Sequence, residues 1–187
     1  MGLPIERTGD HLVNEAIYYD DPEGNGCECY ADRPRETWDW DADGLCSIEP
    51  GIPVDIESLT REAPDDGAAW APSLQLRVGH LNLRVGDYRE AERFYSAIIG
   101  LDWTGRRHIN FAGQPDVTIT FMSSGRYHHH FAANDFTSRG AGLRAPNRAG
   151  LDFVAFAYTP AFDIEAVAHR LAASGAAVER RGGALET

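Results

Sequence analysis

The order of patterns in residues 74–134 constrains the fold most, because one strand, one helix and three further strands are predicted there in succession. Residues 74–85 alternate apolar with polar side chains, as a strand with one buried face does. The polar face of this strand carries His80, Asn82 and Arg84. The pattern therefore predicts a strand that directs a histidine to the face opposite its leucines.

The helix that follows this strand has clear signals at both ends. Asp87 is a capping residue with Glu90 three positions later, and Gly100 ends the helical spacing of apolar side chains. Three strands are then predicted at 103–109, 117–122 and 127–133. Residues 74–134 are therefore predicted to form a complete βαβββ module.

The C-terminal part of the chain begins the same pattern again. Within residues 149–187, a helix capped by Asp163 and closed by Gly175 lies between two predicted strands, 151–158 and 177–180. The pattern stops there, so this segment is predicted to be a partial module.

The N-terminal part carries the end of such a module. Residues 1–31 hold two predicted strands, 11–19 and 27–31. Residues 32–73 form an acidic connector with one helical pattern near 55–63. The chain is thus predicted to be an α+β protein with one complete and two partial βαβββ modules.

The turn at 21–26 and the strand after it place a carboxylate in a defined position. Asp-Pro-Glu-Gly-Asn-Gly favours a tight turn, because proline restricts φ and glycine tolerates positive φ. The period of two then puts Glu28 and Tyr30 on one face and Cys27 and Cys29 on the other. Such a carboxylate suits a metal ligand. The three cysteines, an odd number, predict no disulfide framework.

Composition narrows the class of partner. The net charge is −12, and all 17 basic residues are arginine. An acidic surface disfavours nucleic acid, which is a polyanion. The chain has no run of 18 apolar residues and no signal-peptide pattern at its start, so a cytoplasmic protein without a membrane span is expected.

Several motifs together carry a family resemblance. Residues 78–85, 87–95 and 99–101 resemble the opening of a vicinal-oxygen-chelate module. That superfamily includes glyoxalase I, bleomycin-resistance proteins and extradiol dioxygenases. Residues 10–18, 21–34 and 125–130 resemble a narrower group, the catechol 2,3-dioxygenases of the CatE type. Typical members extend further at both ends.

The resemblance implies a half-open barrel of paired modules and a metal site inside it. Extradiol enzymes hold Fe(II) with two histidines and one glutamate, which leaves positions open for a catecholate and O₂. By position in the matching strands, His80 would be one histidine ligand and Glu28 the carboxylate. The second histidine would lie on a strand that this sequence does not contain. Mn(II) suits the same ligands.

The resemblance also implies roles for residues around the metal. Tyr18 would contact the substrate, His11 would hydrogen-bond the bound diol, and His128 would be the acid–base group. His130 and Asn82 are predicted to bind substrate. On the predicted strand 127–133, His128 and His130 share one face and His129 takes the other. The expected partners are a small aromatic diol and O₂.

Two other functions stay open on the sequence. A metal-free binding protein of the same fold would hold a small aromatic ligand with side chains such as Phe111, Phe121 and Phe153. An inactive or truncated paralogue would need a partner chain, in the simplest case a homodimer, to complete its site. Without the resemblance, His80 and Glu28 are also compatible with ordinary strand residues.

Overall fold

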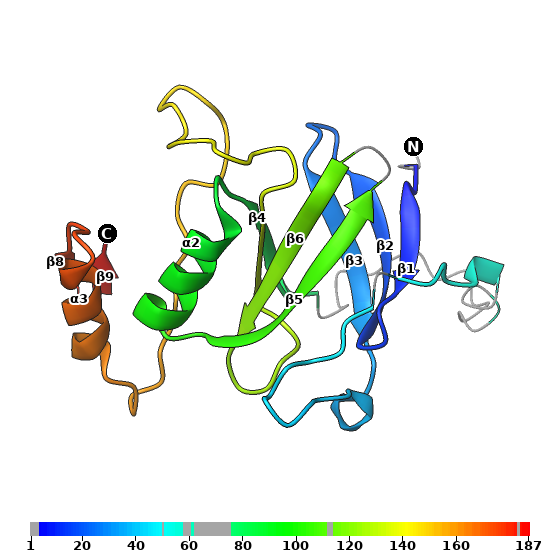
Figure 1. Cartoon of the computed structure of the whole chain (residues 1–187), viewed down its shortest axis with the longest axis horizontal. Coiled ribbons are helices and arrows are strands. Elements are labelled where there is room, and N and C mark those ends of the chain that lie inside the picture. The colour runs from blue at the N-terminus through cyan, green and yellow to red at the C-terminus, as the bar shows by residue number, and fades with distance from the viewer. Residues whose placement is uncertain (1–3, 50, 58–60, 62–75, 112–113, 183) are drawn as a thin grey trace.

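The computed structural model describes residues 4–49, 51–57, 61, 76–111, 114–182 and 184–187. It is an α+β protein in which two sheets lie beside each other and a small helix-and-hairpin unit lies at the far end (Figure 1). The predicted helical pattern near 55–63 falls largely outside the described residues. None of the helices in the described ranges has the length and apolar character that crossing a membrane requires.

The first sheet is an antiparallel meander of β1 (Arg7–Asp10), β2 (Asn14–Asp20) and β3 (Gly26–Asp32). The predicted turn joins β2 to β3, and the Asp21 carboxylate accepts hydrogen bonds from the backbone N–H groups of Glu23 and Asn25. β1 was not predicted, because its residues Arg-Thr-Gly-Asp lack an apolar alternation.

The second sheet contains the predicted βαβββ order. β4 (Leu81–Arg84) pairs in parallel with β7 (Phe131–Asn134), and the antiparallel strands β6 (Gln114–Ser123) and β5 (Asp102–Phe111) complete the order β4-β7-β6-β5. Leu81 and Leu83 pack against the core of Met122, Phe131 and Ala133, as the alternation predicted.

The helix between β4 and β5 lies along this sheet. It comprises α2 (Tyr88–Arg93) and a π-helical continuation, η2 (Phe94–Ile99). The Asp87 carboxylate accepts from the backbone N–H groups of Arg89 and Glu90, and Gly100 ends the helix with φ 99°. Both predicted end signals are confirmed.

Loss of the Asp87 cap is expected to destabilise the protein. Asp87→Ala removes the acceptor for two N–H groups at the helix start, which costs about 0.5–2 kcal/mol of unfolding free energy. Urea unfolding followed by circular dichroism measures this change. Asp39→Ala is the control, because Asp39 is exposed and caps no helix; an equal loss in both variants would contradict the capping role.

The C-terminal unit contains α3 (Ile164–Ala173), β8 (Glu179–Arg181) and β9 (Ala184–Glu186). Asp163 caps α3, as predicted, by accepting from the N–H of Ala166. The predicted strand at 151–158 is wrong, since this segment is not in a strand. Its apolar side chains serve packing instead: Val154 and Phe156 contact the core of the second sheet. No described strand pairs with it, and a strand needs a paired backbone.

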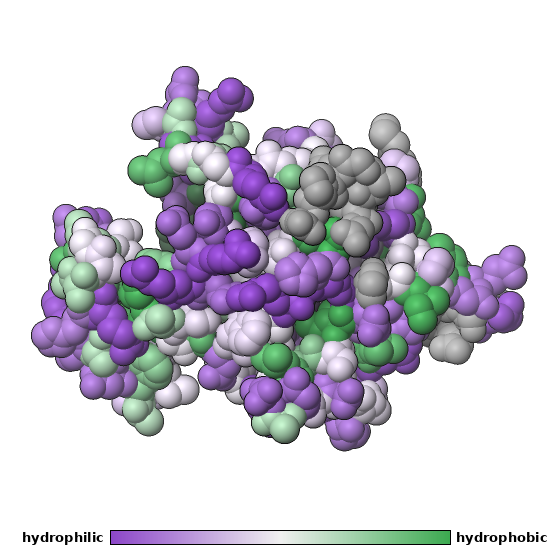
Figure 2. All heavy atoms as spheres, viewed as in Figure 1, coloured by the Kyte–Doolittle hydropathy of each residue, from purple (hydrophilic) through white to green (hydrophobic). Residues whose placement is uncertain are grey.

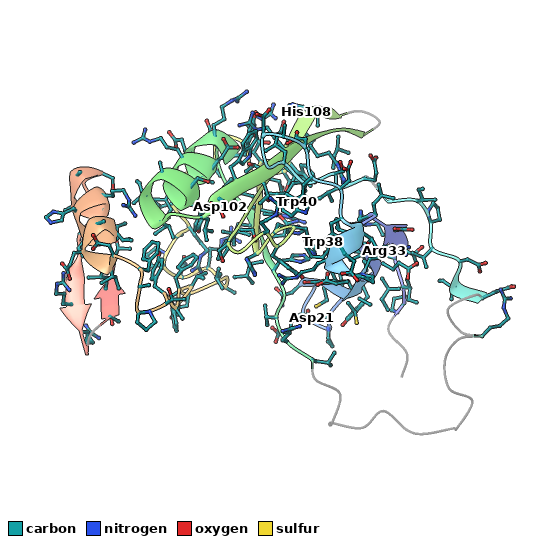
Figure 3. The ribbon with its side chains drawn as sticks, turned by 90° about the horizontal axis from the view of Figure 1, so that it is seen from below. Asp21, Arg33, Trp38, Trp40, Asp102 and His108 are labelled. Atoms are coloured by element: carbon teal, nitrogen blue, oxygen red, sulfur yellow. The ribbon has the colours of Figure 1, made fainter. Side chains whose placement is uncertain are left out.

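Residues 35–48 of the acidic connector belong to the folded core. This segment begins with a short 3₁₀ turn, η1 (Arg35–Thr37), and Trp38 then packs with Val13, Cys46 and Tyr127. The Trp38 indole N–H donates to the carbonyl of Arg33, which lies beside it (Figure 3). The connector therefore binds the two sheets together.

The face over α2 and the second sheet is largely hydrophilic, in keeping with the net charge (Figure 2).

Candidate functional site

A carboxylate and an imidazole from the two sheets meet directly. Glu28 on β3 and His80, just before β4, lie 52 residues apart in sequence, yet Oε2 of Glu28 is 2.9 Å from Nε2 of His80. Both side chains are largely enclosed, with 19% and 7% exposed. Burial raises the pKa of the Glu28 carboxyl, but the hydrogen bond and charge of His80 outweigh it, so this pKa lies below its ordinary value.

Tyr30 supports His80 from the side. Its ring stacks on the imidazole with centroids 5.0 Å apart. Gly79 makes this approach feasible, because a Cβ at this position would lie 1.7 Å from the Tyr30 hydroxyl. Glu28 and Tyr30 were predicted to share one face of β3, from the period of two. Because they do, both side chains reach His80.

A chain of hydrogen bonds leads away from Glu28 on its other side. The Tyr18 hydroxyl donates to Oε1 of Glu28 at 2.7 Å, and Nε2 of His11 lies 2.7 Å from the same hydroxyl. Nδ1 of His11 lies 2.7 Å from the carbonyl oxygen of Glu49. Because a carbonyl only accepts, Nδ1 of His11 donates to Glu49, and the other ring nitrogen contacts the Tyr18 hydroxyl. Burial, then the charge of Glu28, raises the pKa of Tyr18, so its hydroxyl stays a donor.

The three adjacent histidines differ from their predicted arrangement. Residues 127–130 precede β7 and are not in a strand, so the predicted alternation of faces is wrong. The chain turns here through Gly125 and Arg126, both with positive φ. His128 is 0% exposed and His129 is also buried, whereas His130 is half-buried.

Hydrogen bonds connect the buried histidines to β3. Nε2 of His128 lies 3.0 Å from Oδ1 of Asp32, and Nδ1 of His128 lies 2.8 Å from Nδ1 of His129. The Tyr127 hydroxyl donates to Oδ2 of Asp32 at 2.8 Å. The ring of His129 lies 4.3 Å from that of His80, centroid to centroid. This second cluster therefore adjoins the Glu28–His80 pair.

An open groove gives access to the pair. Its volume is about 2130 Å³, and Glu28, His80, Asn82 and His130 line it together with Tyr18. Four exposed apolar side chains also line the groove: Leu76, Val78, Leu143 and Leu151. Of the predicted substrate-binding residues, Asn82 accepts from the side-chain amide of Asn134 and His130 contacts Ser123. Both therefore lie where a ligand in the groove could reach them.

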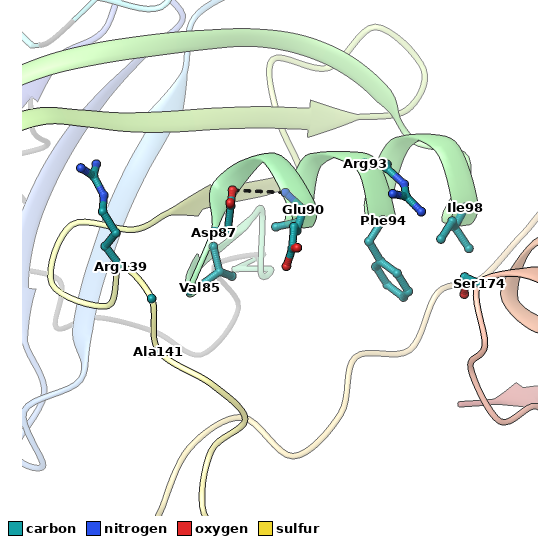
Figure 4. Close-up of a pocket in the computed structure, with 12 residues that line it drawn as sticks. Val85, Asp87, Glu90, Arg93, Phe94, Ile98, Arg139, Ala141 and Ser174 are labelled. Carbon is teal, nitrogen blue, oxygen red and sulfur yellow. Dashed lines mark hydrogen bonds between the residues drawn. The ribbon is translucent and has the colours of Figure 1, made fainter.

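A second hollow lies apart from these residues. Its volume is about 870 Å³, and it is bounded by α2, η2 and residues 139–141 (Figure 4). Asp87, Glu90 and Phe94 line it, and none of the candidate site residues does.

The described residues provide two of the three donors that a facial metal site needs. Within the described ranges, no three His, Cys, Asp or Glu side chains are grouped to hold a metal ion. Glu28 and His80 are one carboxylate and one imidazole that converge on one point. Nδ1 of His80 is buried and has no hydrogen-bond partner among the described groups, although ligand histidines usually donate from their second nitrogen. The pair fits part of such a site.

Comparison with known proteins places the second sheet and the C-terminal unit in a known family. The Glyoxalase/Bleomycin resistance protein/Dioxygenase superfamily matches residues 77–183. The chain belongs to this superfamily. A Bacillus subtilis (strain 168) protein named catechol-2,3-dioxygenase is 39% identical over 171 residues, which cover 91% of this chain. The chain spans 57% of that protein's length. The superfamily membership confirms the α+β fold expected from the motifs, and the two separate sheets form a half-open arrangement without a closed barrel.

Two residues that the structure brings to the Glu28–His80 pair and its neighbours were not among the predicted ones. Asp32 ends β3, although it was predicted to lie in the connector. His129 was assigned to the opposite face of a predicted strand. The period of two on β3 could have indicated Asp32, because it continues the face of Glu28 and Tyr30. Of the aromatic residues predicted for a metal-free binder, Phe121 is buried beside His129, Phe153 is exposed, and the side chain of Phe111 is not among those described.

The buried histidines predict a loss of stability in acid. Burial lowers the pKa of His128, against a smaller opposing effect of Asp32, and it lowers that of His129 far more. Below the ordinary histidine pKa of about 6.5, the unfolded chain binds protons that the fold does not. The unfolding free energy should fall by up to about 1.4 kcal/mol per pH unit for each such histidine. Glu28, whose pKa is lowered, adds a loss of the same sign at lower pH.

Calorimetric unfolding between about pH 7.5 and about pH 5.5 measures this slope. His129→Gln should flatten it, whereas His169→Gln, at an exposed position, should not. A stability that does not change over this range would show that the buried histidines titrate normally.

Proposed function

We propose that this chain carries part of an extradiol-type dioxygenase site, in which Glu28 and His80 are two ligands of a divalent metal. One observation carries the proposal: Oε2 of Glu28 and Nε2 of His80 converge at 2.9 Å on the wall of an open groove. A metal ion uses the same two donor types, and Fe(II) or Mn(II) suits this set. The third protein ligand would come from outside the described residues.

The proposed substrate is a small catechol-like aromatic diol with O₂ as co-substrate. The similarity to a protein named catechol-2,3-dioxygenase supports this class. When bound, the metal would supply the redox chemistry that lets O₂ react with the diol. The chain's own contribution would be to orient the ring through Tyr18, whose hydroxyl donates to Glu28, and through His130 and Asn82 in the groove.

Hydrogen bonds support separate proposed roles for His11 and His128. His11, whose Nδ1–H donates to the carbonyl of Glu49, would hold the Tyr18 hydroxyl in place beside Glu28. His128 is fully buried behind the groove, and both of its ring nitrogens contact protein groups. In this proposal it acts on the substrate through its neighbours rather than by direct contact.

Iron binding and ring cleavage test the proposal together. The purified chain is loaded anaerobically with Fe(II), the bound iron is measured, and a catechol is added in air while the absorbance of the ring-opened product is followed. We expect bound iron and product in the wild type, loss of both in His80→Ala, and retention of both in His169→Ala. A folded wild type that binds no iron and forms no product would overturn the proposal.

An alternative is a metal-free binding protein of the same fold. It is favoured because the described residues group only two metal donors, Glu28 and His80, and not three. Titration of a catechol with EDTA present, followed by tyrosine and tryptophan fluorescence, separates the two functions. Binding that is unchanged by EDTA and by His80→Ala would favour the binder. If iron and product appear only in a dimer by analytical ultracentrifugation, a second copy or another chain would complete the site.

A further inference from the structure

Hydrogen bonds together with burial place the protons in the cluster of Asp32, Tyr127, His128 and His129. A contact of 2.8 Å between Nδ1 of His128 and Nδ1 of His129 requires one proton between the two nitrogens, because two protons or two lone pairs would repel each other. Both rings are buried, with 0% of His128 and 7% of His129 exposed, and burial favours the neutral imidazole, so each ring carries one N–H. The proton between the two rings then belongs either to Nδ1 of His128 or to Nδ1 of His129.

Asp32 decides between these arrangements. The Tyr127 hydroxyl donates its proton to Oδ2 of Asp32, and the Tyr30 hydroxyl, 2.9 Å from that of Tyr127, therefore donates to Tyr127. A carboxylate only accepts, so Nε2 of His128 donates to Oδ1 at 3.0 Å. Nδ1 of His128 is then an acceptor, and the proton between the histidines belongs to Nδ1 of His129.

The free lone pair of the cluster consequently lies on Nε2 of His129. No described protein group bonds to this nitrogen, and its ring lies 4.3 Å from that of His80. His128, by contrast, has both nitrogens engaged and is 0% exposed.

We propose that Asp32 is a positioning residue that sets the tautomers of the His128–His129 pair and thereby makes Nε2 of His129 the unprotonated nitrogen beside His80. Its part in catalysis rests on the proposed function, in which the His129 ring packs against the proposed ligand His80. The tautomers themselves do not depend on that function. They are a property of the protein without metal.

Long-range ¹H–¹⁵N NMR of the histidine rings, on the metal-free chain, reads the tautomers directly. In the wild type we expect His128 as Nε2–H and His129 as Nδ1–H. Asp32→Ala removes the acceptor and leaves a buried N–H unpaired, so the ratio of these tautomers to the opposite ones should fall roughly tenfold or more. Tyr127→Phe is the matched control. It removes the other hydrogen bond to Asp32 and should leave both tautomers unchanged.

A second variant covers the case that Asp32→Ala does not fold. Asp32→Asn presents an amide that can meet the ring with oxygen or N–H, so the Nδ1–H form of His128 should become detectable. A residue with only a structural role would lower the unfolding temperature without moving the tautomers. The proposal is overturned if wild-type His128 is Nδ1–H, or if the folded variant used for the test keeps the wild-type tautomers. Failure to bind iron would overturn only the proposed function.

Discussion

Glu28→Gln is expected to lower the affinity for Fe(II) by more than about 100-fold and to remove ring cleavage. Loss of a residue that only orients a ligand costs about 10- to 100-fold in metal affinity, and Glu28 is proposed as a ligand itself. Glutamine keeps the size of the side chain and a hydrogen-bonding oxygen, so the packing beside His80 and Tyr18 is retained. What it removes is the negative charge.

The measurement is an anaerobic Fe(II) titration followed by the catechol assay. Glu23→Gln is the matched control, because Glu23 is an exposed glutamate on the turn that joins β2 to β3. It should bind iron as the wild type does. Equal iron affinity of the wild type and Glu28→Gln would show that Glu28 is not a ligand.

Trp38→Ala is expected to cost about 3–5 kcal/mol of unfolding free energy, the range for truncating a large buried aromatic side chain. The Trp38 side chain is 6% exposed and packs with Val13, from the turn between β1 and β2, and with Tyr127, from the segment between β6 and β7. Its ring also lies 5.0 Å from that of His128, centroid to centroid. The cavity would therefore loosen the wall behind the site as well as the connection between the sheets.

Urea unfolding monitored by circular dichroism measures the loss. Trp103→Ala is the control, because Trp103 is 37% exposed on β5 and should lose less than half as much. If both variants lost the same free energy, the connector would not be an integral part of the core.

Local signals predicted the parts of the fold that depend on neighbouring residues. The capping of α2 by Asp87 and its end at Gly100 involve groups within one or two helical turns. The face shared by Glu28 and Tyr30 follows from the period of two along β3. Each of these features depends on backbone geometry within a short stretch, so no distant contact was needed to predict it.

Apolar patterning was a weaker guide, because it records burial and not backbone pairing. Residues 151–158 are mostly apolar, as a buried strand would be, yet they only pack against the second sheet. Residues 127–130 were predicted as part of a strand, but the turn at Gly125 and Arg126 leads into an irregular segment before β7. Whether such a segment pairs depends on which strands lie beside it, and that is a property of the whole fold.

The sequence by itself determined the order of elements in residues 74–134, the hairpin that presents Glu28, and the resemblance that made His80 its expected partner. Only the tertiary structure decided that Glu28 and His80 meet across two sheets. It also decided that Asp32 orients the buried pair of His128 and His129. The physical reason is that these contacts join residues 52 and 96 positions apart, at distances set by how the sheets pack. No local pattern encodes such distances.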